Sequence, residues 1–244
     1  MSLSFPRQLL TLFRPWWSNQ TRGRGVAGAF AVFAHELWAF LRDSTPARRR
    51  QRYGDMEYDW EHRVNTTTGT IQWRERLLGM FLTAYQPSDP ADFREMMAAL
   101  PIHFPDFTFL DLGSGKGRTL LLASEYPFAR IIGVEILPEL HRVAEENIAK
   151  YCASVHPGAK MESVCLNACD FVFPPTPLLV YLFNPLPQLA LLRVLQNLEE
   201  SLVRSPREVW VLYYNPLLES TLSASKHLER VGGGERYSLY RART

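Results

Sequence analysis

The strongest constraint on the fold is a glycine-rich turn that separates two short apolar runs. The first run ends at Leu112, and the segment 113–117, GSGKG, follows it at once. A helical pattern comes next, and a second apolar run, residues 130–134, ends at Glu135. Strand, tight turn, helix and strand in this order predict one unit of an open, parallel α/β sheet.

The turn and the acid after the second run indicate a nucleoside cofactor. Glu135 lies twenty residues after Gly115, the spacing at which a carboxylate at a strand end holds the two hydroxyls of a ribose. The glycines let a ligand approach the backbone with no Cβ in the way. The alternative is a glycine-rich turn of the kind found in any α/β protein.

Two phosphate-binding patterns do not match this turn. A P-loop requires GxxxxGK[ST], but Gly117 follows Lys116, and Leu110 stands where the first glycine belongs. A dinucleotide fingerprint requires GxGxxG, and here the third glycine comes one residue early. Asp111, before the glycines, suits a cation better than a pyrophosphate. A nicotinamide-binding oxidoreductase is therefore disfavoured.

The same segment resembles motif I of the class I (seven-strand) methyltransferases, in which an acid precedes x-G-x-G-x-G. The resemblance extends over about residues 92–241. It implies an α/β fold with a Rossmann-like, seven-stranded, mostly parallel sheet, and S-adenosyl-L-methionine as the cofactor. In that family the first acid lies beside the methionine ammonium, a position that Asp111 would take.

Downstream residues extend the resemblance to the rest of the cofactor site. Residues 161–166 are expected to form the third strand, and Asp170 matches the acid that family members place against the adenine amino group. The alternative for Asp170 is an ordinary turn or helix-capping aspartate. The resemblance assigns the cofactor to Asp111, Gly113, Ser114, Gly115, Lys116, Gly117, Glu135, Ile136, Asp170, Phe171 and Asn184.

The acceptor is expected at the end of the fourth strand. The apolar run 178–183 is typical of a central parallel strand, and Asn184-Pro185 follows it. This pair is similar to the (N/D)-P-P-(Y/F) motif of amine-methylating enzymes and to the asparagine motif of non-SET histone-lysine methyltransferases. Leu186 and Pro187 depart from the first motif. Asn184 and Pro185 are the catalytic candidates; the alternative is a proline that ends the strand before a helix at 188–202.

Two other segments are candidates for contact with the acceptor. The run 208–214 is expected to be the fifth strand, and Asn215-Pro216 follows it. Residues 55–69 precede the turn, and by analogy with the family they would form a lid; a solvated linker is the alternative. The candidate substrate residues are Tyr58, Asp59, Thr68, Tyr214 and Asn215.

Helical stripes and a terminal hairpin complete the expected domain. Apolar residues recur at helical spacing at 140, 143, 144 and 148, and again at 191, 194, 195, 198 and 202. The segments 226–231 and 236–240, joined by the glycines 232–234, are expected to pair as an antiparallel hairpin. At 244 residues the chain accommodates a helical extension, residues 1–90, and a methyltransferase domain, residues 91–244.

Charge, cysteine and histidine content bear on the cellular compartment and on metal binding. The formal charge is +2, but residues 1–52 hold nine arginines against Glu36 and Asp43, which makes that segment +7. The three cysteines have no zinc spacing, which indicates free thiols in a reducing, cytoplasmic compartment. The histidines show no metal pattern, so no metal is expected.

The N-terminal region contains an apolar stretch, Val26 to Leu41, that Glu36 interrupts. As a helix it would span about 24 Å, less than the ~30 Å hydrocarbon core of a bilayer. The stretch is therefore not expected to span a membrane or to act as a signal peptide. A helix packed on the catalytic domain is favoured, and peripheral contact with an anionic membrane is the alternative. The arginines 48–52 could touch nucleic acid, but no binding module accompanies them.

These features predict an S-adenosylmethionine-dependent methyltransferase that acts on a nitrogen acceptor. The absence of an aromatic after Asn184-Pro185 favours a protein lysine side chain over a small amine or a nucleobase. A noncatalytic adaptor that binds the cofactor and acts through its basic N-terminus is the alternative from another functional class.

Overall fold

The computed structural model describes residues 5–43, 56–67, 86–156, 160–183 and 186–243. The chain divides into two compact units. The first comprises Met1–Glu61 and Thr67–Gln86, and the second comprises His62–Thr66 and Pro87–Thr244.

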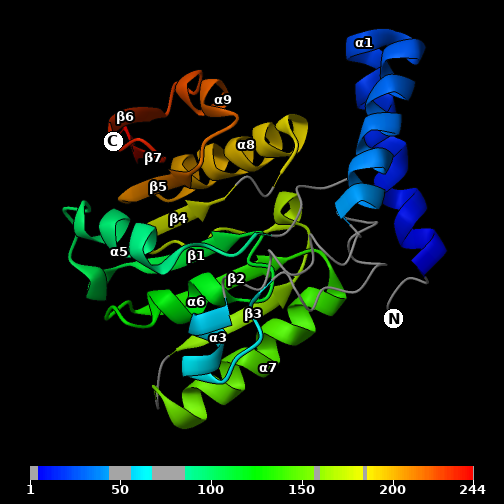
Figure 1. The fold of residues 1–244 in the computed structure, drawn as a ribbon. Helices are drawn as coiled ribbons and strands as arrows, with labels where there is room; N and C mark the ends of the chain where they lie inside the picture. Colours follow the sequence, from blue (N-terminus) through cyan, green and yellow to red (C-terminus); the bar gives the residue numbers. More distant parts are fainter. Residues whose placement is uncertain (1–4, 44–55, 68–85, 157–159, 184–185, 244) are drawn as a thin grey trace. The chain divides into compact units, whose positions relative to one another are not determined.

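The second unit is built on a seven-stranded sheet with strand order β3-β2-β1-β4-β5-β7-β6 (Figure 1). Strands β1 to β5 are parallel, and β7 runs antiparallel to both β5 and β6. The strands are β1 Thr108–Leu112, β2 Arg130–Glu135, β3 Met161–Cys165, β4 Leu178–Leu182, β5 Val209–Tyr214, β6 Leu228–Gly233 and β7 Tyr237–Ala242. The strand order reverses between β1 and β4, which is where open α/β sheets bind ligands. The predicted fold class, including its helical N-terminal extension, is confirmed.

Helices cover both faces of this sheet, with α6 and α7 on one side and α8 on the other (Figure 1). Asp89 caps α5, because its carboxylate accepts hydrogen bonds from the backbone N–H groups of Ala91 and Asp92. The helices are α5 Pro90–Ala98, α6 Arg118–Ala123, α7 Pro138–Ser154, α8 Gln188–Arg204 and α9 Glu219–Ser223, with short 3-10 turns η3 Phe104–Asp106 and η4 Ala168–Asp170.

The sheet centre is covered on both faces, as the continuous apolar runs predict. Every residue of β1, β4 and β5 is buried. On one face these strands pack against the buried stripe of α8, which consists of Leu191, Val194, Leu195 and Leu198. The stripe predicted for this helix is therefore confirmed as core, although Leu202 at its end is only half-buried.

On the other face β2 lies close to the glycine turn at Gly133. A Cβ on Gly133 would come within 2.6 Å of the Ser114 Oγ and 2.7 Å of the Leu120 Cδ1. Both distances are shorter than van der Waals contact. The missing side chain therefore lets the turn and α6 pack directly on the second strand.

The terminal hairpin differs from the expectation in its turn. Strand β6 continues to Gly233, so two of the three glycines predicted to form the turn belong to the strand. The pairing shifts register between Arg230 and Gly232, and such an irregularity bends a strand and increases its twist. Strand β7 extends to Ala242, two residues further than predicted.

The described part of the first unit is helical. Helix α1, Phe5–Asp43, is longer than the predicted stretch, and its direction changes at Gly25, which has φ 69° and ψ 175°. A short helix, α3 Met56–His62, ends at the boundary between the units. Among the described residues, no helix has the length and apolar character required to cross a membrane.

The Gly133→Ala substitution should destabilise the second unit. The new methyl group would force Ser114 and Leu120 away from β2, which we expect to lower the free energy of unfolding by about 1–3 kcal/mol. Gly232→Ala is the matched control, because its Cβ would meet only Leu239, at 3.9 Å or more. Urea unfolding measures both. Equal stability of the two variants would contradict the close approach.

Candidate functional site

The glycine turn wraps around the end of β2. The N–H groups of Gly113 and Ser114 both donate to the Val134 carbonyl, at 2.8 and 3.1 Å, and the Gly117 N–H donates to the Ser114 carbonyl at 2.8 Å. Gly113, Gly115 and Gly117 have φ values of 89°, 54° and 82°. Residues with a side chain rarely adopt this left-handed backbone conformation. The path of the backbone therefore requires glycine at all three positions.

Glu135 ties the end of β2 to the middle of this turn. Its two carboxylate oxygens accept hydrogen bonds from the N–H groups of Gly115, at 2.9 Å, and Leu137, at 2.8 Å. Burial raises the pKa of Glu135, and these backbone donors oppose that rise. The carboxylate is therefore a structural part of the turn as well as a candidate ligand for a ribose.

Asp111, at the end of β1, is held by a chain of buried hydroxyl groups. Thr119 donates a hydrogen bond to its carboxyl group. The Thr119 and Ser88 hydroxyls lie 3.3 Å apart, and Ser88 lies 2.8 Å from the Tyr181 hydroxyl. Burial raises the pKa of Asp111 to about 8, and the nearby Glu135 carboxylate adds to the rise. A cationic ligand beside Asp111 would favour its charged form.

A short segment that precedes the sheet in sequence also lies on the glycine turn. Asn147 of α7 has no exposed surface, and its Oδ1 accepts a hydrogen bond from the Asn65 N–H at 2.8 Å. The Nδ2 of Asn147 donates to the carbonyls of Asn65, at 3.0 Å, and Lys116, at 2.9 Å. Asn147 therefore joins residues 62–66 to the turn with three hydrogen bonds.

Two buried cations strengthen this junction. The Lys116 Nζ donates to the Asn65 Oδ1 at 3.3 Å, and the Arg118 Nε donates to the Thr66 Oγ1 at 2.6 Å. The Lys116 and Arg118 side chains are 2% and 1% exposed. Cations are seldom buried this completely unless they have partners, so these contacts help to explain why residues 62–66 group with the sheet.

Sequence reasoning missed this junction. The buried face of α7 consists of Leu140, Ala144, Asn147 and Tyr151. Positions 140 and 144 of the predicted stripe are thus confirmed, whereas 143 and 148 are only half-buried. An asparagine on an otherwise apolar helical face was the available signal, because buried amides need hydrogen-bond partners. The contacting residues, Asn65 and Thr66, lie within the segment 55–69 that was predicted as a lid, but they were not among its candidate substrate residues.

The remaining cofactor candidates lie along the carboxyl edge of the sheet. Ile136 directly follows β2 and is 38% exposed. Glu135 pairs in register with Cys165 at the end of β3, and the η4 turn then leads to Asp170, which is exposed. Phe171 is half-buried, and its ring packs edge-on against Phe173.

At the carboxyl ends of β4 and β5, aromatic rings meet. The Phe183 and Tyr214 ring centroids are 4.5 Å apart. The Tyr214 hydroxyl donates to the Asp92 carboxylate, which also accepts a hydrogen bond from Arg236 at 2.7 Å. The hydrogen bond from Tyr214 lowers the pKa of Asp92, whereas burial raises the pKa of Tyr214 to about 12. Tyr214 is therefore a hydrogen-bond donor at neutral pH.

The other candidate substrate residues lie in different parts of the chain. Asn215 is exposed and takes the left-handed conformation, with φ 47°, and its N–H donates to the Arg236 carbonyl at 2.6 Å. Tyr58 and Asp59 belong to the first unit, in which Asp59 accepts a hydrogen bond from the Thr67 N–H at 2.8 Å. Asn184, Pro185 and Thr68 lie outside the described residues, so their assigned roles stay predictions.

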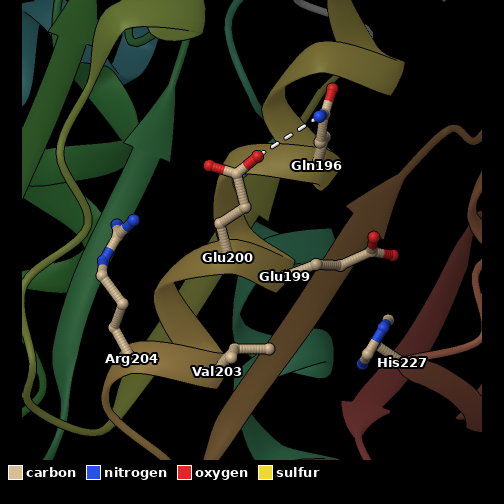
Figure 2. A pocket seen from close by; sticks show the side chains of 6 residues that line it. All are labelled: Gln196, Glu199, Glu200, Val203, Arg204 and His227. Carbon is tan, nitrogen blue, oxygen red and sulfur yellow. Dashed lines mark hydrogen bonds between the residues drawn. The ribbon is translucent and has the colours of Figure 1, made fainter.

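A hollow elsewhere on the second unit contains none of these residues. It lies between the last turns of α8 and the residue before β6 (Figure 2), and it is lined by Gln196, Glu199, Glu200, Val203, Arg204 and His227. Because α8 runs back from the end of β4 to the start of β5, the hollow lies at the opposite edge of the sheet from the glycine turn. Within the described ranges, no cluster of histidine, cysteine or acidic side chains could hold a metal ion.

Comparisons with known proteins return only distant similarities. No family model and no curated protein sequence matches this chain. Similar solved structures include the ribosomal protein L11 methylase of Lactobacillus delbrueckii subsp. bulgaricus, with 15% identity, a TM-score of 0.45, and coverage of 65% of this chain and 80% of that one. An RNA methyltransferase from Salinibacter ruber, in complex with S-adenosyl-L-homocysteine, has 21% identity, a TM-score of 0.40, and coverage of 64% and 92%. TrmN from Thermus thermophilus has 14% identity, a TM-score of 0.46, and coverage of 66% and 51%. These similarities are too low to assign a function to this chain.

Asn147→Ala should loosen the junction between residues 62–66 and the turn. The substitution leaves buried backbone groups of Asn65 and Lys116 without their partner, so we expect the free energy of unfolding to fall by about 3 kcal/mol. Asn197→Ala is the matched control, since this half-buried asparagine makes one hydrogen bond, to the Cys169 carbonyl, and should cost about 1 kcal/mol. Urea unfolding compares the two. A similar loss in both variants would argue against a special role for Asn147.

The Asp111 carboxyl should make stability depend on pH. Its pKa in the folded protein, about 8, exceeds its ordinary value of 3.8, so between these values the folded state binds more protons than the unfolded state. Its contribution is fully present below about pH 4 and is lost as the pH rises through about 8, at up to about 1.4 kcal/mol per pH unit. Asp111→Asn should lack this dependence. Unfolding free energies of both proteins from pH 5 to 9 give the comparison, and parallel curves would show that Asp111 is already ionised.

Proposed function

We propose that this protein is a class I methyltransferase that binds S-adenosyl-L-methionine at the glycine turn and transfers its methyl group to a nitrogen acceptor. The observation that carries the proposal is the arrangement of Asp111, the left-handed glycine turn and Glu135. All three lie at the carboxyl ends of β1 and β2, beside the point where the strand order reverses. This is the position at which open α/β sheets bind nucleotide ligands.

The chemistry of the residues fits this cofactor. The Asp111 carboxyl is suited to the methionine ammonium, because a cation compensates the cost of charging a buried acid. Glu135 already accepts one backbone N–H on each oxygen. A carboxylate oxygen has two lone pairs, so Glu135 can also accept ribose hydroxyls without releasing the turn. Asp170 and Phe171 are assigned to the adenine.

The same features count against a pyrophosphate cofactor. Glu135 and Asp111 are 6% and 3% exposed, and they place two acids around the turn. A pyrophosphate would add negative charge in a poorly solvated place, where Coulomb repulsion is weakly screened. The N–H of Gly115, which a phosphate would need, is already bonded to Glu135. NAD should therefore bind poorly.

The reaction requires alignment more than acid–base chemistry. The bound cofactor supplies an activated methyl group on a sulfonium, so the chain has to hold a neutral nucleophile in line with that group and exclude water. Asn184 and Pro185, at the end of β4, are assigned to the acceptor nitrogen. Tyr214 lies in the next strand, and its pKa of about 12 makes it a poor general base at neutral pH. We assign it a positioning role.

The residues that follow Pro185 bear on the class of the acceptor. A protein lysine side chain is favoured, since Leu186 and Pro187 stand where nucleobase-methylating enzymes of the related motif carry a proline and an aromatic. A small amine or a nucleobase, including one in RNA, is the alternative acceptor. A noncatalytic adaptor would bind the cofactor equally well and would transfer nothing.

Calorimetric titration with S-adenosylmethionine, S-adenosylhomocysteine and NAD tests the cofactor. We expect both sulfur nucleosides to bind with micromolar affinity and NAD to bind at least about a hundredfold more weakly, since pyrophosphate would face two buried acids. Asp111→Ala should abolish binding. Asp106→Ala is the matched control, because this exposed aspartate contacts only His103 among the described hydrogen bonds, and it should bind normally. Tight binding of NAD alone would overturn the assignment.

Incubation of the protein with cell lysate and radiolabelled S-adenosylmethionine tests the transfer itself. Label in protease-sensitive material would identify a protein acceptor, and label in ribonuclease-sensitive material would identify RNA. Cofactor binding without any transfer would favour the adaptor. Asn184→Ala should lose the labelled product to a greater extent than any loss of cofactor affinity in the titration, and full activity of this variant would remove Asn184 from the mechanism.

A further inference from the structure

Helix α1 is a hairpin of two helical halves rather than one rod. At Gly25 the backbone takes φ 69°, outside the helical region. Rings from the two halves pack on each other: the Trp17 and Phe30 centroids are 5.0 Å apart, and Phe33 lies 6.1 Å from both Phe13 and Trp16. The two halves therefore run antiparallel beside each other (Figure 1).

This hairpin leaves large apolar side chains in water. Val26, Phe30 and Trp38 are 61%, 59% and 65% exposed, and Leu10 and Leu37 are also exposed. Val26, Phe30 and Leu37 recur at helical spacing, so they share one face of the second half. The ring pairing brings Leu10 to the level of Leu37. Exposed apolar side chains gathered in this way mark an interaction surface.

The charges around these side chains are almost all positive. Arg14 is exposed on the first half, and Arg22 and Arg24 are exposed at the bend, next to Val26. Within residues 5–43 the sequence has five arginines and two acids, Glu36 and Asp43. Of those acids, Glu36 lies near the His35 ring, at 3.9 Å. The surface that complements this hairpin is therefore negatively charged and has an apolar layer beneath the charge.

We propose that the α1 hairpin docks on the surface of a bilayer that contains anionic lipids. Val26, Phe30 and Leu37, which share one face, would enter the boundary between headgroups and acyl chains with Trp38 beside them, and the arginines at the bend would contact lipid phosphates. Tryptophan and arginine are suited to these two depths. Arginines close to an anionic leaflet strengthen binding by electrostatic attraction to the lipid headgroups.

A lipid surface fits the hairpin better than a nucleic acid does. Arginines alone would serve both partners, because both present phosphates. Val26, Leu10 and Leu37 are aliphatic, and such side chains gain little from stacked bases, whereas they gain from an acyl layer. The inference is independent of the methyltransferase proposal, since it uses no residue of the glycine turn.

Sedimentation of the full-length protein with large vesicles tests this docking. We expect the protein to sediment with vesicles of phosphatidylcholine mixed with phosphatidylglycerol and to remain in the supernatant with phosphatidylcholine alone. Raising the salt concentration should weaken the binding, because it screens the arginines. Absence of binding to the mixed vesicles, or equal binding to both kinds, would overturn the proposal.

Two sets of variants separate the apolar and the charged contributions. Val26→Ser with Trp38→Ser should weaken vesicle binding about tenfold or more, as should Arg22→Gln with Arg24→Gln. Val172→Ser with Val203→Ser is the matched control, since these valines are 79% and 73% exposed in the second unit, and it should bind as the unaltered protein does.

Other occupants of the apolar face would give different results. If the face packs on the chain itself, Val26→Ser with Trp38→Ser should lower the free energy of unfolding and leave vesicle binding unchanged, which would overturn the proposal. Binding of single-stranded RNA that mixed vesicles fail to displace would also count against it. Circular dichroism checks that each variant keeps its helix content, and an unaltered spectrum with lost vesicle binding supports the docking surface.

Discussion

The site depends on one interaction, the pair of hydrogen bonds by which Glu135 binds the N–H groups of Gly115 and Leu137. A left-handed glycine turn directs its N–H groups inward, and buried donors must be satisfied. Glu135 supplies the acceptor from the next strand, so the turn and the end of β2 hold each other in place. The lack of a side chain at Gly133 permits this, because it lets Ser114 and Leu120 reach the strand. A ligand would therefore meet a turn that is already shaped.

The glycine turn is also held by contacts with residues 62–66, which precede the sheet in sequence. Asn147 joins it to residues 62–66, and Lys116 and Arg118 add contacts with Asn65 and Thr66. In the proposed enzyme this arrangement would couple a segment before the sheet to the cofactor site without a direct contact to the cofactor. Asp111 is positioned in the same manner, through Thr119, Ser88 and Tyr181. Polar networks of this kind are rigid when every member is satisfied, and rigidity is useful to an enzyme whose main task is alignment.

The two units carry different kinds of chemistry. The second unit concentrates buried acids and glycines at one edge of a sheet, which suits a small cofactor. The first unit exposes arginines and apolar rings on a helical hairpin, which suits an extended surface. If both proposals hold, methyl transfer would take place beside an anionic membrane, and acceptors that are themselves bound to the membrane would be favoured by their higher local concentration.

The sequence by itself determined the fold class, because apolar runs, a glycine turn and helical stripes are local patterns whose periods identify strands and helices. It also identified Asp111 and Glu135 as site residues, because both lie at the carboxyl ends of predicted strands. Only the tertiary structure decided what these acids touch. The junction of Asn147 with Asn65, the chain of hydroxyls to Tyr181 and the Asp92–Tyr214–Arg236 group join residues that are far apart in the chain. The predicted helical stretch began at Val26, directly after the bend at Gly25, but the helical half of α1 before Gly25 was not predicted. That half packs on the second through aromatic rings, and such long-range contacts leave no period in the sequence.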